Sequence, residues 1–322
     1  MSFKFYLFLI AAFVLLALVA ISSGGASISL GDIVKFFTFG EIDETKQLIL
    51  LQMRLPRLVM GILVGALLAT SGVVVQSVFL NPLADPYIIG IASAATFGAV
   101  IAYLLGLSDV FYGIFAFLSA SALSIVIFKL AAHTRSISTL LIVGIAVSSF
   151  LGAFTSFAVY LIGEDSFRIT AWMMGYLGGA NWQKIALLLP PLLFCMAYFY
   201  AKRHELNIIL NGDEEAKSLG LNVEKSKKSL LIVSSLIIGF SVAFTGMIGF
   251  VGLIIPHTLR MALRTSSNAV LIPASALTGG LFLLFCDVIA KNILSPVEIP
   301  IGVVTSFFGA PFFLYLAFRK HA

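Results

Sequence analysis

The chain has 322 residues, of which 60% are hydrophobic and only 11% are charged, and its formal net charge is +5. This composition excludes a soluble globular domain, in which about 25% of residues are charged. The apolar runs are uninterrupted, which also excludes the alternating strands of an outer-membrane barrel. The sequence therefore predicts an all-α polytopic membrane protein.

A helix needs about 20 mostly apolar residues to cross a bilayer. On that basis we expect about ten transmembrane helices in a single membrane domain over residues 1–322. The expected spans are 5–23, 57–79, 87–106, 111–131, 138–162, 184–201, 229–250, 252–264, 270–290 and 302–319. The first could be a cleaved secretion signal, but its long apolar run and the later spans favour an uncleaved helix. The eighth is too short to cross alone, which predicts a broken or partial span.

Basic residues are unevenly divided between the two sides of this predicted bundle. With the N-terminus in the cytoplasm, seven of the 20 Lys and Arg fall outside, namely Lys35, Lys46, Arg54, Arg57, Arg168, Lys184 and Lys291. The positive-inside rule therefore predicts that both termini are cytoplasmic. The pair in "QMRLPRLVMG" is an exception to the rule. Snorkelling at a helix end is one explanation of the two arginines, and a functional role is the other.

Two segments carry a possible internal repeat, "ATSGVVVQSVFLNP" at 69–82 and "AFTGMIGFVGLIIP" at 243–256. Gly72 and Gly246 hold the same place in the two copies. Five expected spans separate the copies, and an odd number inverts the second copy, as in transporters with inverted repeats. Chance matches of Gly, Ala and Pro are common in apolar sequence, so the signal is weak.

The segment 202–228, "KRHELNIILNGDEEAKSLGLNVEKSKK", is too polar to enter lipid. Its central stretch "DEEAKSLGL" begins with acidic residues and ends at Gly220, which predicts a short helix outside the membrane. A solvated loop and a docking element for another subunit are equally compatible with this pattern.

Motifs for common enzyme chemistry are missing from the sequence. It has no GxxxxGK[ST] phosphate loop, no HExxH and no cluster of Cys and His. Of the fifteen acidic residues only Asp287 lies clearly within an expected span, and Lys291 follows it by four residues, so we expect the two to pair. A self-neutralised pair is a poor proton relay, which argues against the alternative of a secondary transporter driven by an ion gradient.

Four long stretches resemble one known family. "LPRLVMGILVGALLATSGVVVQSVFLNPLADPYIIG", "GDEEAKSLGL", "GMIGFVGLIIPHTLRM" and "IPIGVVTSFFGAPFFLYL" are similar, in this order, to the FecCD-like permease subunits of ABC importers for iron-siderophores, haem and cobalamin. The resemblance covers essentially the whole chain. It implies a type II ABC importer permease fold with two inverted-repeat-like halves.

The resemblance also implies partners. A second permease subunit, giving a homodimer, two cytoplasmic ATPase subunits that use ATP, and a periplasmic or lipid-anchored substrate-binding protein are expected around this chain. The chain itself is then a transport subunit of the bacterial cytoplasmic (inner) membrane, not an enzyme, and binds no cofactor or metal. Its expected cargo is a siderophore, haem or cobalamin, and the residues do not distinguish among them.

Site residues follow from the same resemblance. It implies that Arg54 and Arg57, with Lys291 as a third cation that lacks the planar guanidinium, dock the binding protein. It implies that ATPase coupling rests on Gly212, Asp213, Glu214, Ala216, Leu219 and Gly220. It further implies a gate formed by Asn81 and Leu83 of "NPLADP" and by Ser136, Ile137 and Ser138 of "RSIST". A plain turn forced by two prolines is the other explanation of "NPLADP".

Overall fold

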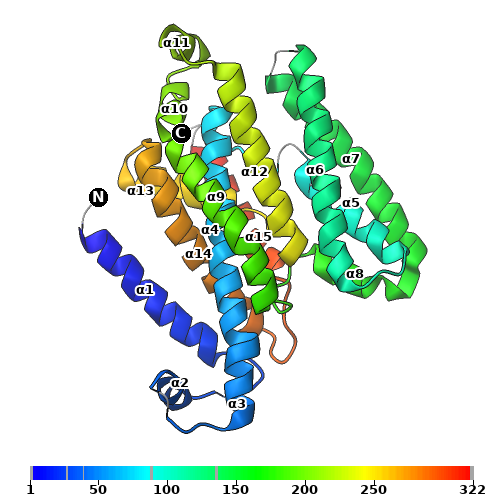
Figure 1. Ribbon diagram of the computed structural model, residues 1–322, viewed down its shortest axis with the longest axis vertical. Coiled ribbons are helices and arrows are strands. Elements are labelled where there is room, and N and C mark those ends of the chain that lie inside the picture. The colour runs from blue at the N-terminus through cyan, green and yellow to red at the C-terminus, as the bar shows by residue number, and fades with distance from the viewer. Residues whose placement is uncertain (1–2, 27, 39, 88–89, 135–136, 320–322) are drawn as a thin grey trace.

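The computed structural model describes residues 3–26, 28–38, 40–87, 90–134 and 137–319, and their only regular secondary structure is helical (Figure 1). This confirms the all-α prediction. The first half contains α1 Phe3–Ser22, α2 Leu30–Phe37, α3 Glu44–Ile49, the π-helix η1 Leu50–Arg54, α4 Leu55–Val78, α5 Ile91–Leu104, α6 Asp109–Thr134 and α7 Ile137–Ile162. The rest contains the 3-10 turn η2 Gly163–Ser166, α8 Phe167–Met173, α9 Trp182–Ala201, α10 Arg203–Ile209, α11 Asp213–Ser218, α12 Val223–Thr245, α13 Val251–Leu263, α14 Asn268–Asn292 and α15 Ile301–Arg319.

Six helical stretches of the described residues are long and apolar enough to cross a bilayer. They are Glu44–Val78, Val110–Ile127, Ile142–Met173, Trp182–Ala201, Val223–Thr245 and Asn268–Asn292, and four shorter apolar helices accompany them. Each of the ten expected spans thus coincides with an apolar helix, although only six reach spanning length. The chain is a multi-pass membrane protein.

Two of the four shorter apolar helices have the fewest residues, α5 with 14 and α13 with 13. At about 1.5 Å per residue each covers only about 20 Å of the 30 Å hydrocarbon core. The short eighth span, which is α13, was predicted. The third span was expected to begin at residue 87, but the corresponding helix α5 begins at Ile91. The reason is local, because Gly90 adopts a left-handed conformation with φ 83° and the described residues 81–87 are not helical.

A similar order of helix lengths, long, short, long and long, occurs twice. The helices α4 to α7 have 24, 14, 26 and 26 residues, and α12 to α15 have 23, 13, 25 and 19. The register expected from the two glycines is nevertheless wrong. Gly72 lies within α4, whereas Gly246 follows the end of α12 with φ 67°.

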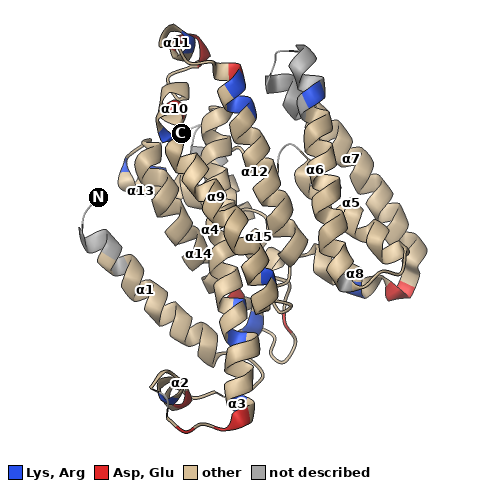
Figure 2. Cartoon of the chain, in the orientation of Figure 1, with Lys and Arg blue, Asp and Glu red and all other residues tan. Residues whose placement is uncertain are grey.

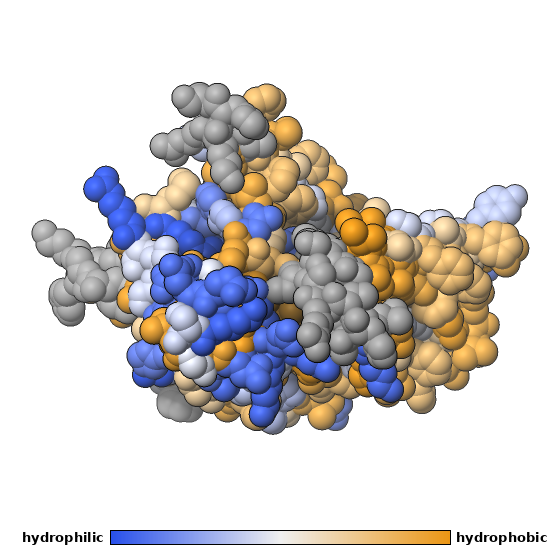
Figure 3. All heavy atoms as spheres, turned by 90° about the horizontal axis from the view of Figure 1, so that it is seen from above, coloured by the Kyte–Doolittle hydropathy of each residue, from blue (hydrophilic) through white to orange (hydrophobic). Residues whose placement is uncertain are grey.

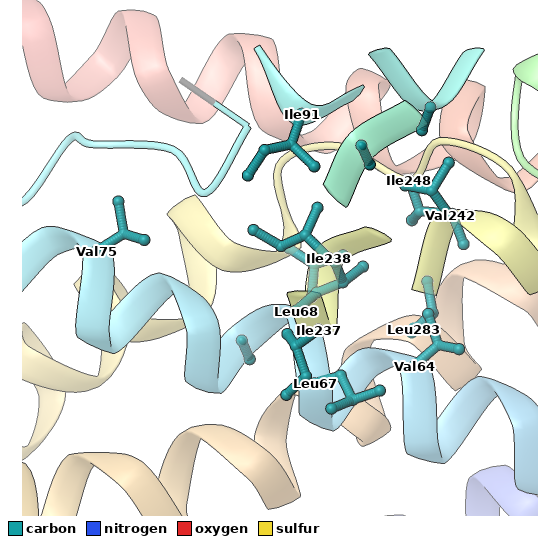
Figure 4. Close-up of a cluster of buried hydrophobic side chains, with 14 of the residues drawn as sticks. Val64, Leu67, Leu68, Val75, Ile91, Ile237, Ile238, Val242, Ile248 and Leu283 are labelled. Atoms are coloured by element: carbon teal, nitrogen blue, oxygen red, sulfur yellow. The ribbon is translucent and has the colours of Figure 1, made fainter. Parts of the chain in front are cut away.

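The long helix α4 runs through the middle of the bundle and forms the core with α12, α13 and α14 (Figure 1). Branched apolar side chains from these helices meet in Figure 4, among them Val64, Leu68, Ile238 and Leu283, all at most 1% exposed. Small residues bring the backbones together where helices cross. A Cβ on Gly72 would lie 1.9 Å from the carbonyl oxygen of Gly252 on α13, so that crossing requires glycine.

The elongated molecule has two ends with different structure (Figure 1). One end carries α2 and α3 and is called the α3 end below. The opposite end carries α10 and α11 and is called the α11 end. The helices α5 to α8 stand as a group beside the central bundle, where α6 packs on α12.

Candidate functional site: an apolar cavity between two charged ends

Near the α3 end, Arg54 is the last residue of η1 and is only 8% exposed. Its guanidinium donates hydrogen bonds to three backbone carbonyls, that of Ile21 near the end of α1 at 2.8 Å and those of Ser23 and, at 2.8 Å, Ala26 in the turn that follows α1. Gly24 in this turn has φ 130°, and a Cβ there would lie 2.9 Å from the Arg54 Nη2. The arginine therefore fastens the end of α1 to the start of α4.

Arg57, one turn further along α4, lies between two acidic residues. Its Nε donates to Asp287 Oδ1 at 3.0 Å, and its Nη1 donates to both carboxylate oxygens of Glu298, at 3.0 and 2.8 Å. The side chain of Asp287 is 2% exposed, that of Arg57 is 12% exposed, and that of Glu298 is 32% exposed. The group bridges α4, α14 and the segment that leads into α15.

Lys291 completes this charged cluster from within α14. Its Nζ lies 3.0 Å from Asp287 Oδ2, which confirms the pairing predicted from the spacing of four residues. The same ammonium donates to the Ala20 carbonyl of α1 at 3.1 Å, and the residue is 6% exposed. We call Arg54, Arg57, Asp287, Lys291 and Glu298 the outer cluster.

The three basic residues expected to dock a partner thus lie together, but they are not an open cationic patch. Arg54 and Lys291 face inward, toward carbonyls and Asp287, and the surface part of the cluster is the Arg57–Glu298 pair. The docking role stays a prediction. The pairing of Glu298 with Arg57 could not be predicted from a local sequence pattern, since 241 positions separate the two residues.

A cavity of about 980 Å³ occupies the side of the central bundle. Its walls come from the segment between α4 and α5, the turn between α12 and α13, and α15 between Gly302 and Phe313. Twelve residues of helix make the α15 wall about 18 Å long. Most lining side chains are apolar, such as Met247 and Phe307, and Asp85 is the one charged side chain among the described lining residues.

The polar groups of the wall are engaged locally. Asp85 accepts a hydrogen bond from its near neighbour, the backbone N–H of Tyr87, at 2.7 Å, and the Tyr87 hydroxyl donates to the Ile248 carbonyl at 3.3 Å. Ser306 donates to the Gly302 carbonyl one turn earlier. The cavity thus offers a passing solute few free hydrogen-bonding groups, which makes it suited to weak, nonspecific contact with a bulky solute.

The cavity is closed along one side by three chain segments held together by backbone hydrogen bonds. Tyr176 N–H donates to the Thr245 carbonyl at 2.7 Å, and Gly302 N–H donates to the Met174 carbonyl at 3.1 Å. A Cβ on Gly246 would lie 1.9 Å from the Trp172 carbonyl oxygen, so the segments meet only because glycine is present. These bonds couple α8, α12 and α15 at the cavity wall.

Of the expected gate residues, Leu83 lies in the cavity wall. Asn81 is exposed and its side-chain oxygen accepts from the Leu83 N–H at 3.0 Å, so it holds the turn that presents Leu83. Leu80 before it has φ 51°. Ser136 lies outside the described residues. Ile137 and Ser138 begin α7, but their side chains also lie outside the described part, so the second gate stays a prediction.

At the α11 end, the expected coupling residues form a compact helical turn. Ala216 is fully buried, whereas Glu214 has a side chain that is 92% exposed and Leu219 is 66% exposed. Gly212 and Gly220 have φ of 108° and 84° and bound the helix, which confirms the predicted stop at Gly220. The turn therefore presents an apolar tip with acidic neighbours to the surroundings.

A buried lysine anchors this turn to the membrane-spanning α12. Lys227 Nζ lies 2.6 Å from Asp213 Oδ1, and the lysine side chain is 6% exposed. Behind it, Glu205 on α10 accepts from Lys202 at 2.5 Å and from Ser226 at 2.6 Å. Burial alone would raise the pKa of Glu205, but these two hydrogen bonds lower it overall. No local sequence pattern singles out Lys227 among the clustered lysines.

The described residues contain no group of three His, Cys, Asp or Glu side chains that could hold a metal ion. The arrangement is a cavity with a rigid ionic cluster at one end and an exposed helical turn at the other. Its chemistry suits the passage of a solute and the transmission of movement.

Comparison with known proteins gives a consistent result. The model of the FecCD transport family matches residues 10–319. The Cobalamin import system permease protein BtuC of Halobacterium salinarum is 42% identical over 280 residues, which are 85% of this chain and 74% of that protein. The Hemin transport system permease protein HmuU of Yersinia pestis is 36% identical over 97% of this chain and 95% of its own length.

A solved structure described as an inward-facing conformation of a metal-chelate type ABC transporter has the same fold. Its TM-score is 0.87 at 31% identity, with 98% of this chain and 99% of that chain covered. These comparisons confirm the resemblance inferred from the four sequence stretches.

Proposed function

We propose that this chain, which belongs to the FecCD transport family, is the permease subunit of an ABC importer for cobalamin, haem or an iron chelate. The observation that carries the proposal is the apolar cavity of about 980 Å³ in a chain that matches this family along nearly its whole length. The relatives named for cobalamin and hemin transport support a cargo of this bulky, chelated kind.

In this proposal the chain is one membrane domain over residues 1–322 with ten transmembrane helices. The helices α4 to α7 and α12 to α15 form two inverted halves, as their matching lengths suggest. The short α5 and α13 occupy corresponding places in the two halves, and the segment preceding each helix borders the cavity.

We place the α11 end in the cytoplasm. Basic residues gather on α10, α11 and the beginning of α12 at this end (Figure 2), and the view onto it shows a polar surface beside apolar flanks (Figure 3). The positive-inside rule favours this orientation in the cytoplasmic membrane. It puts both chain termini on the cytoplasmic side, because α1 ends at the α3 end and α15 starts there.

ATP is hydrolysed, in this account, by two separate subunits that receive the exposed turn of α11 in a cleft. Leu219 provides the apolar contact, and Glu214 stands at its edge. Movement of the turn reaches α12 through the Asp213–Lys227 ion pair and the buried Ala216, and α12 ends at the cavity wall. The cycle is then a shift between two arrangements of the permease pair.

On the opposite side a substrate-binding protein docks over the outer cluster. Because Glu298 holds Arg57 by two hydrogen bonds, an acidic residue of that protein must displace Glu298 to reach the guanidinium. Arg54 and Lys291 then act mainly by keeping the surface in place and by adding positive potential. A second copy of the chain completes the path beside α15 and Leu83.

The proposal is tested by uptake in proteoliposomes that contain this chain, the ATPase subunit and the binding protein, with labelled ferric siderophore, haem and cobalamin offered in parallel. We expect accumulation of one cargo that requires ATP and all three components. Accumulation by this chain alone under an ion gradient would contradict the proposal and support a secondary transporter.

A further inference from the structure

A second, smaller crevice of about 260 Å³ lies between α6 and α12, apart from the transport cavity. Its lining includes two lysines, two serines and apolar side chains, among them Lys129, Lys228, Ser121, Ser124, Ile125 and Leu236. None of these residues belongs to the outer cluster, the cavity wall or the α11 turn. The proposed transport mechanism leaves the crevice without a role.

The order of residues along the two helices gives the crevice a charged mouth and an apolar floor. On α6, Ile125 and Lys129 follow Ser121 by four and eight positions, and on α12, Leu236 follows Lys228 by eight. Such spacings keep the residues of each helix on one face. Eight residues span about 12 Å, so the lysines lie together nearest the α11 end and the rest extends toward the bilayer centre.

The side chains at this crevice face the surroundings of the bundle. Ile125 is 56% exposed and Leu236 is 38% exposed, so this part of the surface contacts lipid in a membrane-spanning chain. The hydroxyl of Ser124 donates to the Ala120 carbonyl, but the buried oxygen of Ser121 has no hydrogen-bond partner among the described residues. A ligand here therefore meets cations and one unsatisfied hydroxyl above apolar side chains.

We propose that this crevice binds an anionic phospholipid. The phosphate lies between the ammonium groups of Lys129 and Lys228, and an acyl chain lies along Ile125 and Leu236. A free phosphate uses only the mouth and leaves the apolar floor exposed, whereas a zwitterionic lipid adds a cation beside two lysines. Paired basic residues between membrane helices at the cytoplasmic face suit an anionic headgroup.

The inference goes beyond the proposed transport function, and only its assignment to the cytoplasmic leaflet rests on the orientation given above. A bound lipid would join α6 to α12, and α12 carries the lysine that anchors the α11 turn. The lipid site thus lies at the boundary between the α5–α8 group and the helix that connects the α11 end to the cavity.

The test measures binding of phosphatidylglycerol and phosphatidylcholine to the purified full-length chain by native mass spectrometry, without ATPase or cargo. The variant K129Q/K228Q removes both cations. The control K35Q/K225Q removes the same charge from two exposed lysines outside the crevice. A third variant, Ile125→Trp, fills the apolar floor and keeps both lysines.

We expect phosphatidylglycerol to bind in preference to phosphatidylcholine and K129Q/K228Q to weaken its binding about 25-fold, because each lysine near an anionic headgroup is worth about fivefold. Ile125→Trp should also weaken binding, and the control should not. Equal binding by all variants, equal loss in both double variants, or equally strong binding of glycerol phosphate would overturn the proposal. Because no transport is measured, these outcomes do not depend on the proposed importer function.

Discussion

The two ends of the molecule use charge in different ways. At the α3 end, the outer cluster is mostly buried and its cations are shared among carboxylates and carbonyls of four chain segments. At the α11 end, one buried ion pair anchors a short helix whose outer face stays exposed. The difference indicates that the outer cluster holds helices in fixed positions, whereas the α11 turn presents an exposed face, as its proposed contact with an ATPase subunit requires.

The largest effect is expected at the centre of the outer cluster. Asp287→Asn leaves Arg57 and Lys291 buried without their shared carboxylate, and breaking a buried ion pair in this way costs about 3–5 kcal/mol. Denaturation of the purified chain in detergent measures the loss. Glu298→Gln serves as the control and should cost less than 1 kcal/mol, because Glu298 is partly exposed. Equal stability of the two variants would contradict a fixed, buried cluster.

A change at the exposed tip of the α11 end should have the opposite result, because it should leave stability unaltered and weaken association with a partner. Leu219→Asp should leave the stability of the chain within about 0.5 kcal/mol of the wild type, since the side chain is 66% exposed. It should weaken association with the ATPase subunit by at least tenfold, because a charge replaces the central apolar contact. Co-purification and surface binding measure association. Lys217→Gln, on the same turn, is the control, and unaltered association of Leu219→Asp would exclude the turn as the contact.

A smaller effect is expected where the outer cluster meets the surface. Glu298→Gln removes the internal competitor for Arg57 and should strengthen binding of the substrate-binding protein about threefold at low salt, with less gain at high salt. Titration of the binding protein against the reconstituted permease tests this. Glu41→Gln, an exposed change at the same end, should have no such effect. Weaker binding of Glu298→Gln would show that Glu298 is not a competitor.

The smallest effect concerns the short helices beyond the outer cluster. Asp32 on α2 is bound by Lys46 of α3 at 2.8 Å and by Ser29, and these hydrogen bonds lower the pKa of Asp32 to about 2. Since the folded value is below the usual 3.8, the contact contributes stability above that pH, and the contribution is lost as the pH falls through about 2.

Carboxyl NMR shifts of labelled aspartate follow this titration. Lys46→Gln should raise the pKa of Asp32 toward its usual value. The control is Lys35→Gln, which lies on α2 like Asp32 and should leave the pKa of Asp32 low. An Asp32 that titrates at its usual value in the wild-type protein would show that α2 and α3 are not joined by this contact.

The sequence predicted what depends on nearby residues. The apolar runs located the apolar helices, of which six reach spanning length among the described residues. The spacing of four residues predicted the Asp287–Lys291 pair, and Gly220 marked the end of α11. Contacts between distant segments were not predictable. Arg57 meets Asp287 across 230 positions, and Arg54 binds backbone carbonyls that any residue type supplies. The internal repeat was assigned the wrong register because isolated glycines match by chance in apolar sequence.

The resemblance to the permease family added roles that no local pattern contains, such as docking and coupling. It did not reveal that Arg54 and Lys291 are buried, because exposure depends on how α1 packs against α14. The cavity wall was equally hidden, since it joins the segment after α4 to α15 from the other half of the chain.

The most direct test of the account compares two energy sources in the same proteoliposomes. The complete importer, with wild-type permease or with Leu219→Asp, receives cobalamin, haem or ferric siderophore either with ATP on the α11 side or with only an ion gradient. The account predicts uptake with ATP by the wild type, strong reduction by Leu219→Asp, and no uptake with the gradient alone. Gradient-driven uptake that is indifferent to Leu219→Asp would contradict it.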